Sequence, residues 1–370
     1  MVFLWLSLLK KGHEKGIDER LTEEMQKKDI ISCTAEELKN YLSSVGEKSF
    51  RAMQIYEWLH QKLVDNFDEM SNISNKLKEQ LKEDFYIETL EVVKVLTSKI
   101  DGTQKFLFKL RDGNVIESVL MKYKHGNSVC ISTQVGCRMG CRFCASTLDG
   151  LVRNLTSSEM LKEIYTIQKY SGERVSNIVL MGSGEPMDNF DNVTAFVNAI
   201  SDENGLHISQ RNITISTCGL IDNIKKLADM NVQVTLALSL HAADDETRKE
   251  LMPVARRYTI REVLDACTYY FNKTKRRITF EYSLVSGVND NITEAKKLVA
   301  LIKGMNCHVN LIPVNPIKER DYKKSSNSSI IGFKTYLEKN GINVTIRREM
   351  GSDIQGACGQ LRKSFIEAGT

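Results

Sequence analysis

Apolar residues in the first quarter of the chain recur at the three- and four-residue spacing of amphipathic helices. Thr34–Glu37 has the sequence of a capping box, in which two side chains satisfy free backbone groups at a helix start. Leu38, Tyr41 and Leu42 follow at helical spacing, and similar spacing recurs near Ile55 and Leu77. We therefore expect a small helical domain over residues 29–91.

Between residues 92 and 125 the apolar positions change to short alternating runs. The runs Lys105–Leu110 and Val115–Met121 are separated by Asp112 and Gly113, a pair typical of hairpin turns. This stretch is predicted to be a β connector.

From residue 126 to 350, β-branched apolar runs alternate with amphipathic stretches. Capping-box sequences at Thr156–Glu159 and Thr259–Glu262 mark two helix starts. Strands that alternate with helices predict an α/β fold with a parallel sheet. The expected strands are Val129–Thr133, Asn177–Met181, Asn212–Ser216, Val234–Ser239, Ile278–Leu284 and Cys307–Ile312, with a seventh at Asn343–Arg348.

Composition limits the possible classes of protein. With 370 residues, 42% of them hydrophobic, the chain can bury a large core, and it is not a disordered polymer. The net charge of +4 permits an anionic partner without requiring one. Nine unevenly spaced cysteines are too few for a disulfide scaffold and indicate reduced thiols in a cytoplasmic protein.

The apolar run Met1–Leu9 is about half the length that a bilayer span needs and precedes no cleavage-site pattern. We expect residues 1–28 to be a leader, with Met25 as a candidate start, and we expect no membrane association.

In α/β barrels the loops after the carboxyl ends of the strands carry the chemistry. The loop after the first core strand contains Cys137, Cys141 and Cys144 in the spacing C-x-x-x-C-x-x-C. A closed structural zinc site takes four ligands, and iron–sulfur clusters usually take four cysteines. A [4Fe–4S] cluster held by three thiolates would leave one iron open for another ligand. The alternatives are a zinc site completed by a distant Cys or His, or unrelated buried cysteines.

The cysteine spacing resembles the defining motif of the radical S-adenosylmethionine (SAM) superfamily, whose open iron binds SAM. Gly184-Glu185-Pro186 resembles that superfamily's turn for the SAM amine. The strings 130–137 (CISTQVGC), 239–241 (SLH) and 356–361 (GACGQL) narrow the resemblance to the RlmN family of RNA adenine methyltransferases, over nearly the whole chain from about residue 29. The implied fold is a partial (β/α)6 radical SAM barrel at residues 126–350, with a C-terminal segment, 351–370, that carries a methyl-carrier cysteine.

The resemblance also implies the cofactors, a [4Fe–4S] cluster and two SAM molecules per turnover, and the residues that bind them. The cluster ligands would be Cys137, Cys141 and Cys144, and the SAM contacts would be Gly184, Glu185, Ser216, Ser239, Leu240, His241 and Asn315. Two positions depart from the usual family pattern: Ser183 stands where a hydrophobic residue is frequent, and Cys218 where serine is common. Neither change removes an implied ligand.

In the family mechanism a first SAM methylates a cysteine, here Cys358, and a second SAM yields a 5′-deoxyadenosyl radical that takes hydrogen from that methyl group. The resulting methylene adds to adenine C2, which joins enzyme and RNA covalently. Glu117 matches the proton acceptor. Cys130 matches the thiol that releases the product and leaves a Cys130–Cys358 disulfide, which a reductant resets. Without the resemblance, Glu117 would be taken for a solvated strand residue.

The implied substrates are an adenosine of the peptidyl-transferase centre in 23S rRNA and the adenosine 3′ of the anticodon in tRNA. We also expect an electron donor such as flavodoxin or ferredoxin, a monomeric enzyme, and an RNA-binding role for residues 29–91. Basic clusters are candidate phosphate contacts, although by composition alone they are ordinary solvated surface. They are Lys122/Lys124, Arg256/Arg257, Lys273–Arg277, Lys318–Lys324 and Arg347/Arg348.

Two rival functions stay open at this point. One is adenine C8 methylation of rRNA, as in the resistance enzyme Cfr, although Pro186 favours C2 because Cfr carries alanine there. The other is a non-catalytic RNA-binding module with a structural zinc ion.

Overall fold

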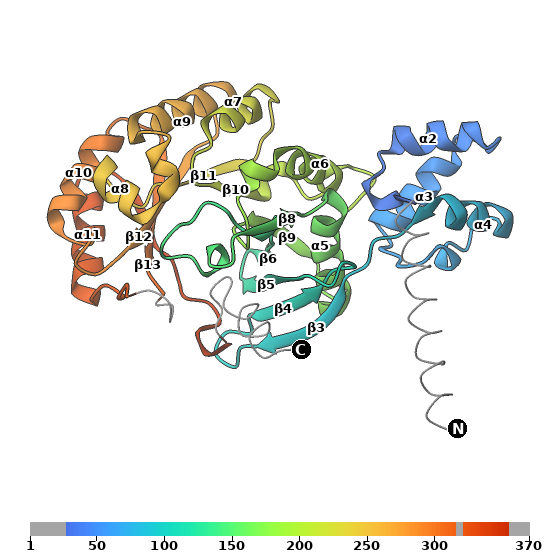
Figure 1. Ribbon diagram of the computed structural model, residues 1–370, viewed down its shortest axis with the longest axis horizontal. Helices are drawn as coiled ribbons and strands as arrows, with labels where there is room; N and C mark the ends of the chain where they lie inside the picture. Colours follow the sequence, from blue (N-terminus) through green and yellow to red (C-terminus); the bar gives the residue numbers. More distant parts are fainter. Residues whose placement is uncertain (1–26, 316–320, 355–370) are drawn as a thin grey trace, which may run out of the picture. The chain divides into compact units, whose positions relative to one another are not determined.

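The computed structural model describes residues 27–315 and 321–354. These residues form two compact units, which are described one at a time (Figure 1). The first unit contains the described residues up to Thr89 together with Asp202–His207. The second contains Leu90–Ser201 and the described residues from Ile208 onward.

The first unit is helical, as its apolar pattern predicts. Its helices are α2 (Ala35–Ser44), α3 (Arg51–His60) and α4 (Asn75–Asp84), and the short strands β1 (Lys28–Asp29) and β2 (Phe85–Tyr86) pair in parallel. The predicted capping box is confirmed: Thr34 Oγ1 accepts from Glu37 N at 3.2 Å, and the Glu37 carboxylate accepts from Thr34 N at 2.8 Å. The apolar positions of the pattern, among them Leu38 and Leu77, are buried.

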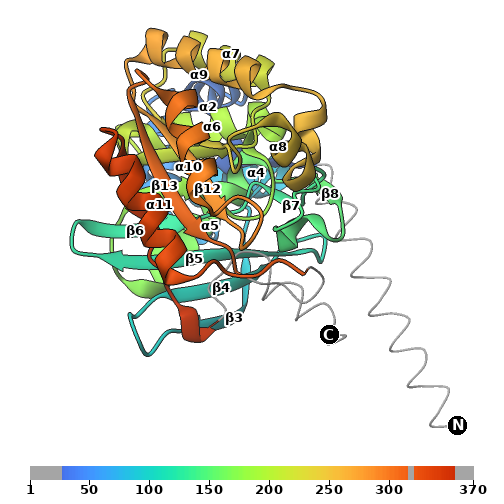
Figure 2. The ribbon, with the colours of Figure 1, turned by 90° about the vertical axis from the view of Figure 1, so that its left-hand side faces the viewer.

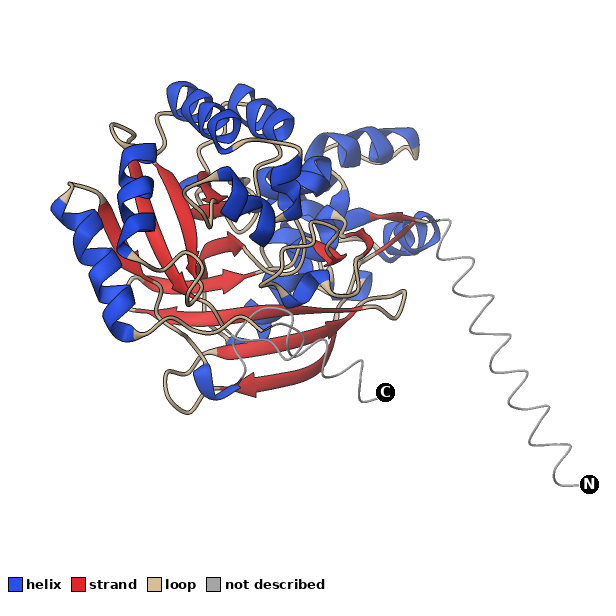
Figure 3. Cartoon of the chain, turned by 60° about the vertical axis from the view of Figure 1, so that its left-hand side comes forward, coloured by secondary structure: helices blue, strands red, loops and turns tan. Residues whose placement is uncertain are grey.

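The second unit is built on one ten-stranded sheet, in the order β14-β13-β12-β11-β10-β9-β6-β5-β4-β3. Its parallel strands are β6 (Gly126–Cys130), β9 (Val175–Leu180), β10 (Ile213–Thr217), β11 (Thr235–Ser239), β12 (Ile278–Leu284), β13 (Cys307–Pro313) and β14 (Asn343–Ile346). All seven predicted core strands are therefore present, with ends that shift by up to three residues. Figure 3 shows the strands curving together inside a layer of helices.

The helices of this unit alternate with the parallel strands, as in a (β/α) barrel. They are α5 (Ser157–Ser171), α6 (Phe190–Ser201), α7 (Ile221–Asp229), α8 (Asp245–Leu251), α9 (Ile260–Thr274), α10 (Ile292–Ile302) and α11 (Asn327–Lys339). The capping boxes predicted at Thr156 and Thr259 start α5 and α9. The fold is thus the expected open α/β barrel, which Figure 2 shows from one side.

The stretch expected as a β connector forms the antiparallel edge of the same sheet. Its strands are β3 (Glu91–Thr97), β4 (Gln104–Lys109) and β5 (Val115–Tyr123), and β5 pairs directly with β6. The predicted hairpin turn is present, since Asn114 N donates to Asp112 Oδ1 at 3.0 Å and Gly113 has φ +82°. The hydrogen-bond ladder therefore runs without a break from this edge into the parallel strands.

No helix in the described part of the chain is both long enough and apolar enough to cross a bilayer. Residues 1–26, where the leader was expected, lie outside the described residues, as do Lys318 and Cys358.

Candidate active site at the strand ends

The loop that carries the three cysteines begins at a close contact between two backbone segments. Gly136 ends the short strand β7 (Gln134–Gly136) with φ +77°, and a Cβ there would lie 2.0 Å from the carbonyl oxygen of Gly150. Cys137 N donates to the same oxygen at 2.8 Å, and Cys144 N donates to Cys141 O at 3.1 Å. Only glycine fits at position 136, because any side chain would push the two ends of the loop apart.

The loop gathers thiols in a water-poor environment. Cys137 is buried, and Cys141 and Cys144 are partly exposed. Burial is the main reason why the pKa of Cys137 rises to about 12, and neighbouring Cys144 adds to it. Burial also raises the pKa of Cys141, with Cys144 and Cys137 contributing next. Thiolates in this environment need a compensating positive charge, and a bound metal centre supplies one.

The donor set of this loop is three thiols with no histidine, which is typical of iron–sulfur chemistry. Within residues 27–315 and 321–354, no three His, Cys, Asp or Glu side chains converge as tightly as the ligands of a single metal ion. The three thiols of the loop are therefore the donor set that an iron–sulfur cluster takes.

The turn after β9 packs against the strand that leads into the cysteine loop. Gly184 has φ +109°, and a Cβ there would lie 2.7 Å from Gln134 N. Glu185 N donates to Gln134 Oε1 at 2.9 Å, while the Glu185 carboxylate accepts from Cys218 N at 2.8 Å and from Met187 N at 3.0 Å. Burial raises the pKa of Glu185. Glu185 thus ties the ends of three strands together beside the thiols.

The ends of β10 and β11 bring the next expected residues together. The hydroxyls of Ser216 and Ser239 lie 3.5 Å apart, both partly exposed. Leu240 N and His241 N both donate to Glu281 O, at 3.0 and 3.2 Å, and His241 takes a left-handed φ of +56°. Asn315, also partly exposed, follows the carboxyl end of β13, at the same edge of the sheet.

His241 is a neutral imidazole in this fold. Burial, assisted by the nearby Arg248 charge, lowers its pKa to about 3. Its Nδ1 accepts from Ser283 N at 2.9 Å, which leaves the proton on Nε2. The ring meets Phe143 of the cysteine loop edge-on, with centroids 4.7 Å apart. His241 therefore joins β11 to the cysteine loop and does not act as an acid at neutral pH.

The antiparallel edge contributes a second group of expected residues. In the register of β5 and β6, Val119 lies opposite Cys130, so Glu117, two residues along β5, projects from the same face as Cys130. Cys130 is 3% exposed and packs with Val119 and Met121. Ser132 Oγ donates to Glu117 O at 2.8 Å, which fixes this part of β5 to the segment leading to the cysteine loop.

Comparison with known proteins decides the family. Residues 28–87 match the family described as "Ribosomal RNA large subunit methyltransferase N-terminal domain", and residues 131–299 match the radical SAM superfamily. A protein of Lachnospira eligens named "Probable dual-specificity RNA methyltransferase RlmN" is 62% identical over 92% of this chain and 97% of its own length. A protein of the same name from Clostridium novyi is 59% identical over 92% and 99%.

The chain belongs to the RlmN family. A solved radical SAM methyltransferase from Sphaerobacter thermophilus agrees, with 39% identity and a TM-score of 0.86 over 90% of this chain and 98% of that one. This RlmN-family chain is therefore an enzyme, which excludes the non-catalytic zinc module. Membership in the radical SAM superfamily implies a [4Fe–4S] cluster and SAM as its cofactors.

Arg248 belongs to this RlmN site, although sequence reasoning missed it. Its side chain on α8 is fully buried and donates to the carbonyl oxygens of Cys218 at 2.8 Å and Leu240 at 3.2 Å. Within the described residues its Nη1 has no hydrogen-bond partner. In sequence, α8 looks like a solvated charged helix, so nothing distinguishes Arg248 from the partly exposed Lys249 beside it.

The segment Met350–Asp353, which precedes Cys358 in the chain, contacts the antiparallel edge of the RlmN sheet. Met350 packs against the Cys130 cluster, Gly351 N donates to Asp101 Oδ2 at 3.0 Å, and the Asp353 carboxylate accepts from Ser98 Oγ at 2.6 Å and Lys99 N at 2.9 Å. The described chain ends at Ile354, four residues before Cys358.

The candidate phosphate contacts of the RlmN chain differ in what they already contact. Lys122, Lys273 and Lys324 already form ion pairs, with Glu173, Asp229 and Glu349 respectively. By contrast, Arg256 and Arg257 are exposed at the end of the short helix Pro253–Arg256, which packs beside Gly140 of the cysteine loop. These two arginines are the better placed to meet an anionic substrate.

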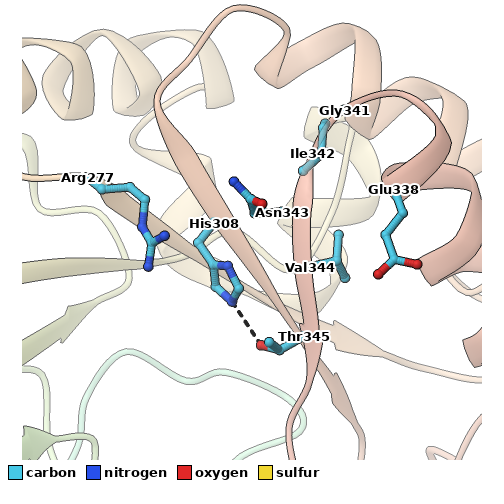
Figure 4. Close-up of a pocket in the computed structure, with 8 residues that line it drawn as sticks. All are labelled: Arg277, His308, Glu338, Gly341, Ile342, Asn343, Val344 and Thr345. Carbon is cyan, nitrogen blue, oxygen red and sulfur yellow. Dashed lines mark hydrogen bonds between the residues drawn. The ribbon is translucent and has the colours of Figure 1, made fainter.

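A separate hollow lies at the amino ends of β13 and β14, away from the strand ends that carry the RlmN site. Arg277, His308, Asn343 and Thr345 line it, and His308 Nε2 lies 2.9 Å from Thr345 Oγ1 (Figure 4). Glu338 of α11 closes one side. Arg277 was expected as a candidate phosphate contact, but none of the expected catalytic, SAM-binding or cluster-binding residues lines this hollow.

Proposed function

We propose that this enzyme methylates C2 of adenine in 23S rRNA, at the peptidyl-transferase centre, and in tRNA, at the adenosine 3′ of the anticodon. The observation that carries the proposal is the shared face of Cys130 and Glu117 beside the cysteine loop. A resolving thiol and a proton acceptor are what a methyl transfer through a protein cysteine requires.

Cys137, Cys141 and Cys144 would hold the cluster. The residues that would hold SAM are Gly184, Glu185, Ser216, Ser239, Leu240, His241 and Asn315. Together these cofactors supply a methyl group and a 5′-deoxyadenosyl radical, while reducing electrons come from a donor such as flavodoxin or ferredoxin.

The chain's own residues then complete the transfer. Cys358 carries the one-carbon unit as an S-methyl group and joins it to adenine C2. Glu117 accepts the proton that C2 loses. The Cys130 thiolate attacks the Cys358 sulfur, so the carbon–sulfur bond breaks and a disulfide remains. The electron pair stays with the methylene carbon on adenine, which takes up a proton and so completes the methyl group of the product. Two electrons from a reductant return both cysteines to thiols.

The target base must leave its stack to reach the strand ends, at a cost of a few kcal/mol, so loops of structured RNA are suitable substrates. We assign the accessory RNA contact to residues 29–91 and a monomeric state to the enzyme. Deletion of residues 30–88 is then expected to abolish tRNA binding.

Nucleoside mass spectrometry of RNA treated with the anaerobically reconstituted enzyme tests the proposal. The expected product is 2-methyladenosine in both rRNA and tRNA. Formation of 8-methyladenosine instead would identify a Cfr-type enzyme. Purified protein that contains zinc, lacks iron and still methylates RNA would overturn the cluster assignment.

A further inference from the structure

The proposed proton acceptor, Glu117, is one partner of a buried ion pair. Lys105 of β4 reaches Glu117 of β5, with Nζ 3.1 Å from Oε2. In the antiparallel register Lys105 lies opposite Val119 and Leu107 opposite Glu117, so the two charged side chains are diagonal neighbours on one face. Val119 in turn lies opposite Cys130, which places the pair on the face that carries the resolving thiol.

The two partners differ in access to solvent. The Lys105 side chain is 0% exposed, whereas the Glu117 side chain is 7% exposed. The ammonium is therefore enclosed behind the carboxylate, and only the carboxylate borders the accessible side. A substrate that reaches this face meets Glu117 before it can meet Lys105.

A buried ion pair of this kind contributes little to the stability of the fold. Removing two charges from water carries a desolvation penalty that their attraction often fails to recover, and well-packed apolar residues would serve the fold as well or better. The same sheet has a lysine–glutamate pair in a cheaper setting: Lys109 and Glu91 approach to 3.8 Å, with half or more of each side chain exposed. The contrast favours a role for buried Lys105 in the chemistry at Glu117.

We propose that Lys105 is the positioning residue that keeps Glu117 ionised and oriented to accept the proton from adenine C2. This inference rests on the proposed function and deepens it. In the step, the C2–H bond breaks, the proton moves to a Glu117 carboxylate oxygen, and the electron pair stays in the adenine ring. The neutral acid then faces an ammonium that has lost its counter-charge, which favours loss of the proton and resets the base.

Other titratable groups near Glu117 do not replace Lys105. Within the described residues, the Cys130 thiol on β6 shares its face, and Glu163 of α5 lies on the opposite face, where its carboxylate accepts from Ser118 Oγ and from Ser132 N. Burial raises the pKa of Glu163. Lys94 of β3 lies opposite Leu107 and so belongs to the same face, but it is exposed, which leaves Lys105 as the buried cation among these neighbours.

The test replaces Lys105 in the full-length, reconstituted enzyme and follows single-turnover methylation of tRNA from pH 6 to 9. Burial without a counter-charge favours the neutral form of a carboxyl group, which cannot accept a proton. We expect Lys105→Met to lower the rate at pH 7 by about 100-fold, the usual scale for a general base, and the deficit to shrink about tenfold per pH unit above pH 7. Lys105→Arg, which keeps the charge, should restore most of the rate.

Three controls keep the result interpretable. Lys109→Met removes the exposed lysine of the same strand and should leave the pH profile unchanged. The double variant Lys105→Met/Glu117→Gln lacks both buried charges and shows whether the sheet folds without the pair. Infrared spectra without RNA should show a protonated carboxyl in Lys105→Met that is absent from the double variant.

A folded Lys105→Met enzyme whose pH profile and infrared spectrum match the wild type would overturn the inference. If the wild-type chain itself fails to methylate C2, the proposed function fails instead. The infrared measurement would still decide whether Lys105 controls the charge of Glu117.

Discussion

The parallel strands and the antiparallel edge of one sheet contribute to the site in different ways. The parallel strands offer loops and turns beyond their ends, where glycines such as Gly136 and Gly184 bring backbone segments together. The antiparallel edge offers side chains from within its strands, held by register, such as Glu117 and Lys105. Loops suit the enclosure of cofactors, whereas a ladder of hydrogen bonds suits a base that must keep one position.

The largest expected effect comes from the thiols on the parallel side. Cys137→Ser should abolish methylation, because a hydroxyl is a poor ligand for iron. Iron and sulfide content and the visible spectrum of the anaerobically reconstituted protein measure the loss. Cys267→Ala, which alters a buried cysteine of α9 outside the site, is the matched control and should keep full iron.

The next largest effect distinguishes the roles of Cys358 and Cys130 in the proposed transfer. Cys358→Ala should stop methylation with no covalent RNA, since nothing carries the one-carbon unit. Cys130→Ala should stop release and leave RNA attached to the protein on a denaturing gel. Cys218→Ala controls for the extra thiol near the site. Full turnover by Cys358→Ala would disprove the carrier scheme.

A smaller effect is expected from a substitution in the turn after β9. Gly184→Ala combines a positive φ with a clash against Gln134 N at 2.7 Å, and we expect about 1–3 kcal/mol of strain and a loss of SAM affinity of about tenfold or more. Gly172 also has a positive φ, +67°, but lies in open space, so for Gly172→Ala calorimetry should show a modest loss of stability and SAM binding should be unchanged.

A weaker, graded effect is expected for the exposed arginines beside the cysteine loop. Arg256→Ala should weaken tRNA binding several-fold and reduce the slope of log affinity against log salt by about one. Filter binding over a range of salt concentrations measures both. Lys334→Ala on α11 changes a partly exposed cation that pairs with Glu338, and equal losses in the two variants would argue against a local contact.

The smallest effect is the loss, at low pH, of the hydrogen bond between Asp101 and Gly351 that anchors the C-terminal segment. Burial alone would raise the pKa of Asp101, but hydrogen bonds from Gly351 N and Thr103 lower it to about 2. Because this folded pKa lies below the ordinary value, the contact is intact above about pH 4 and is lost as pH falls toward 2. The protection factor of the Gly351 amide, which corrects for the pH dependence of the intrinsic exchange rate, should fall over that range, and Asp101→Asn should show a low protection factor already at neutral pH.

The sequence was sufficient to predict the parallel strands, three capping boxes and the cysteine loop, because each depends on local spacing. It could not show that residues 91–123 continue the core sheet, since strand pairing between β5 and β6 is set by tertiary contacts and not by alternation. Lys105 and Arg248 were missed for a related reason. A charged residue in a polar-looking run is buried only once distant segments close over it.

The anchor formed by Ser98, Asp101 and Asp353 joins positions about 250 residues apart in the chain. The tip of the β3–β4 hairpin consequently holds the segment Gly351–Asp353 in place, although the tip contains no reacting group. Exchanging that hairpin for one from another protein, or fusing a partner there, would detach the tail while leaving every cofactor ligand intact. Engineers who want an accessible insertion point should choose another loop.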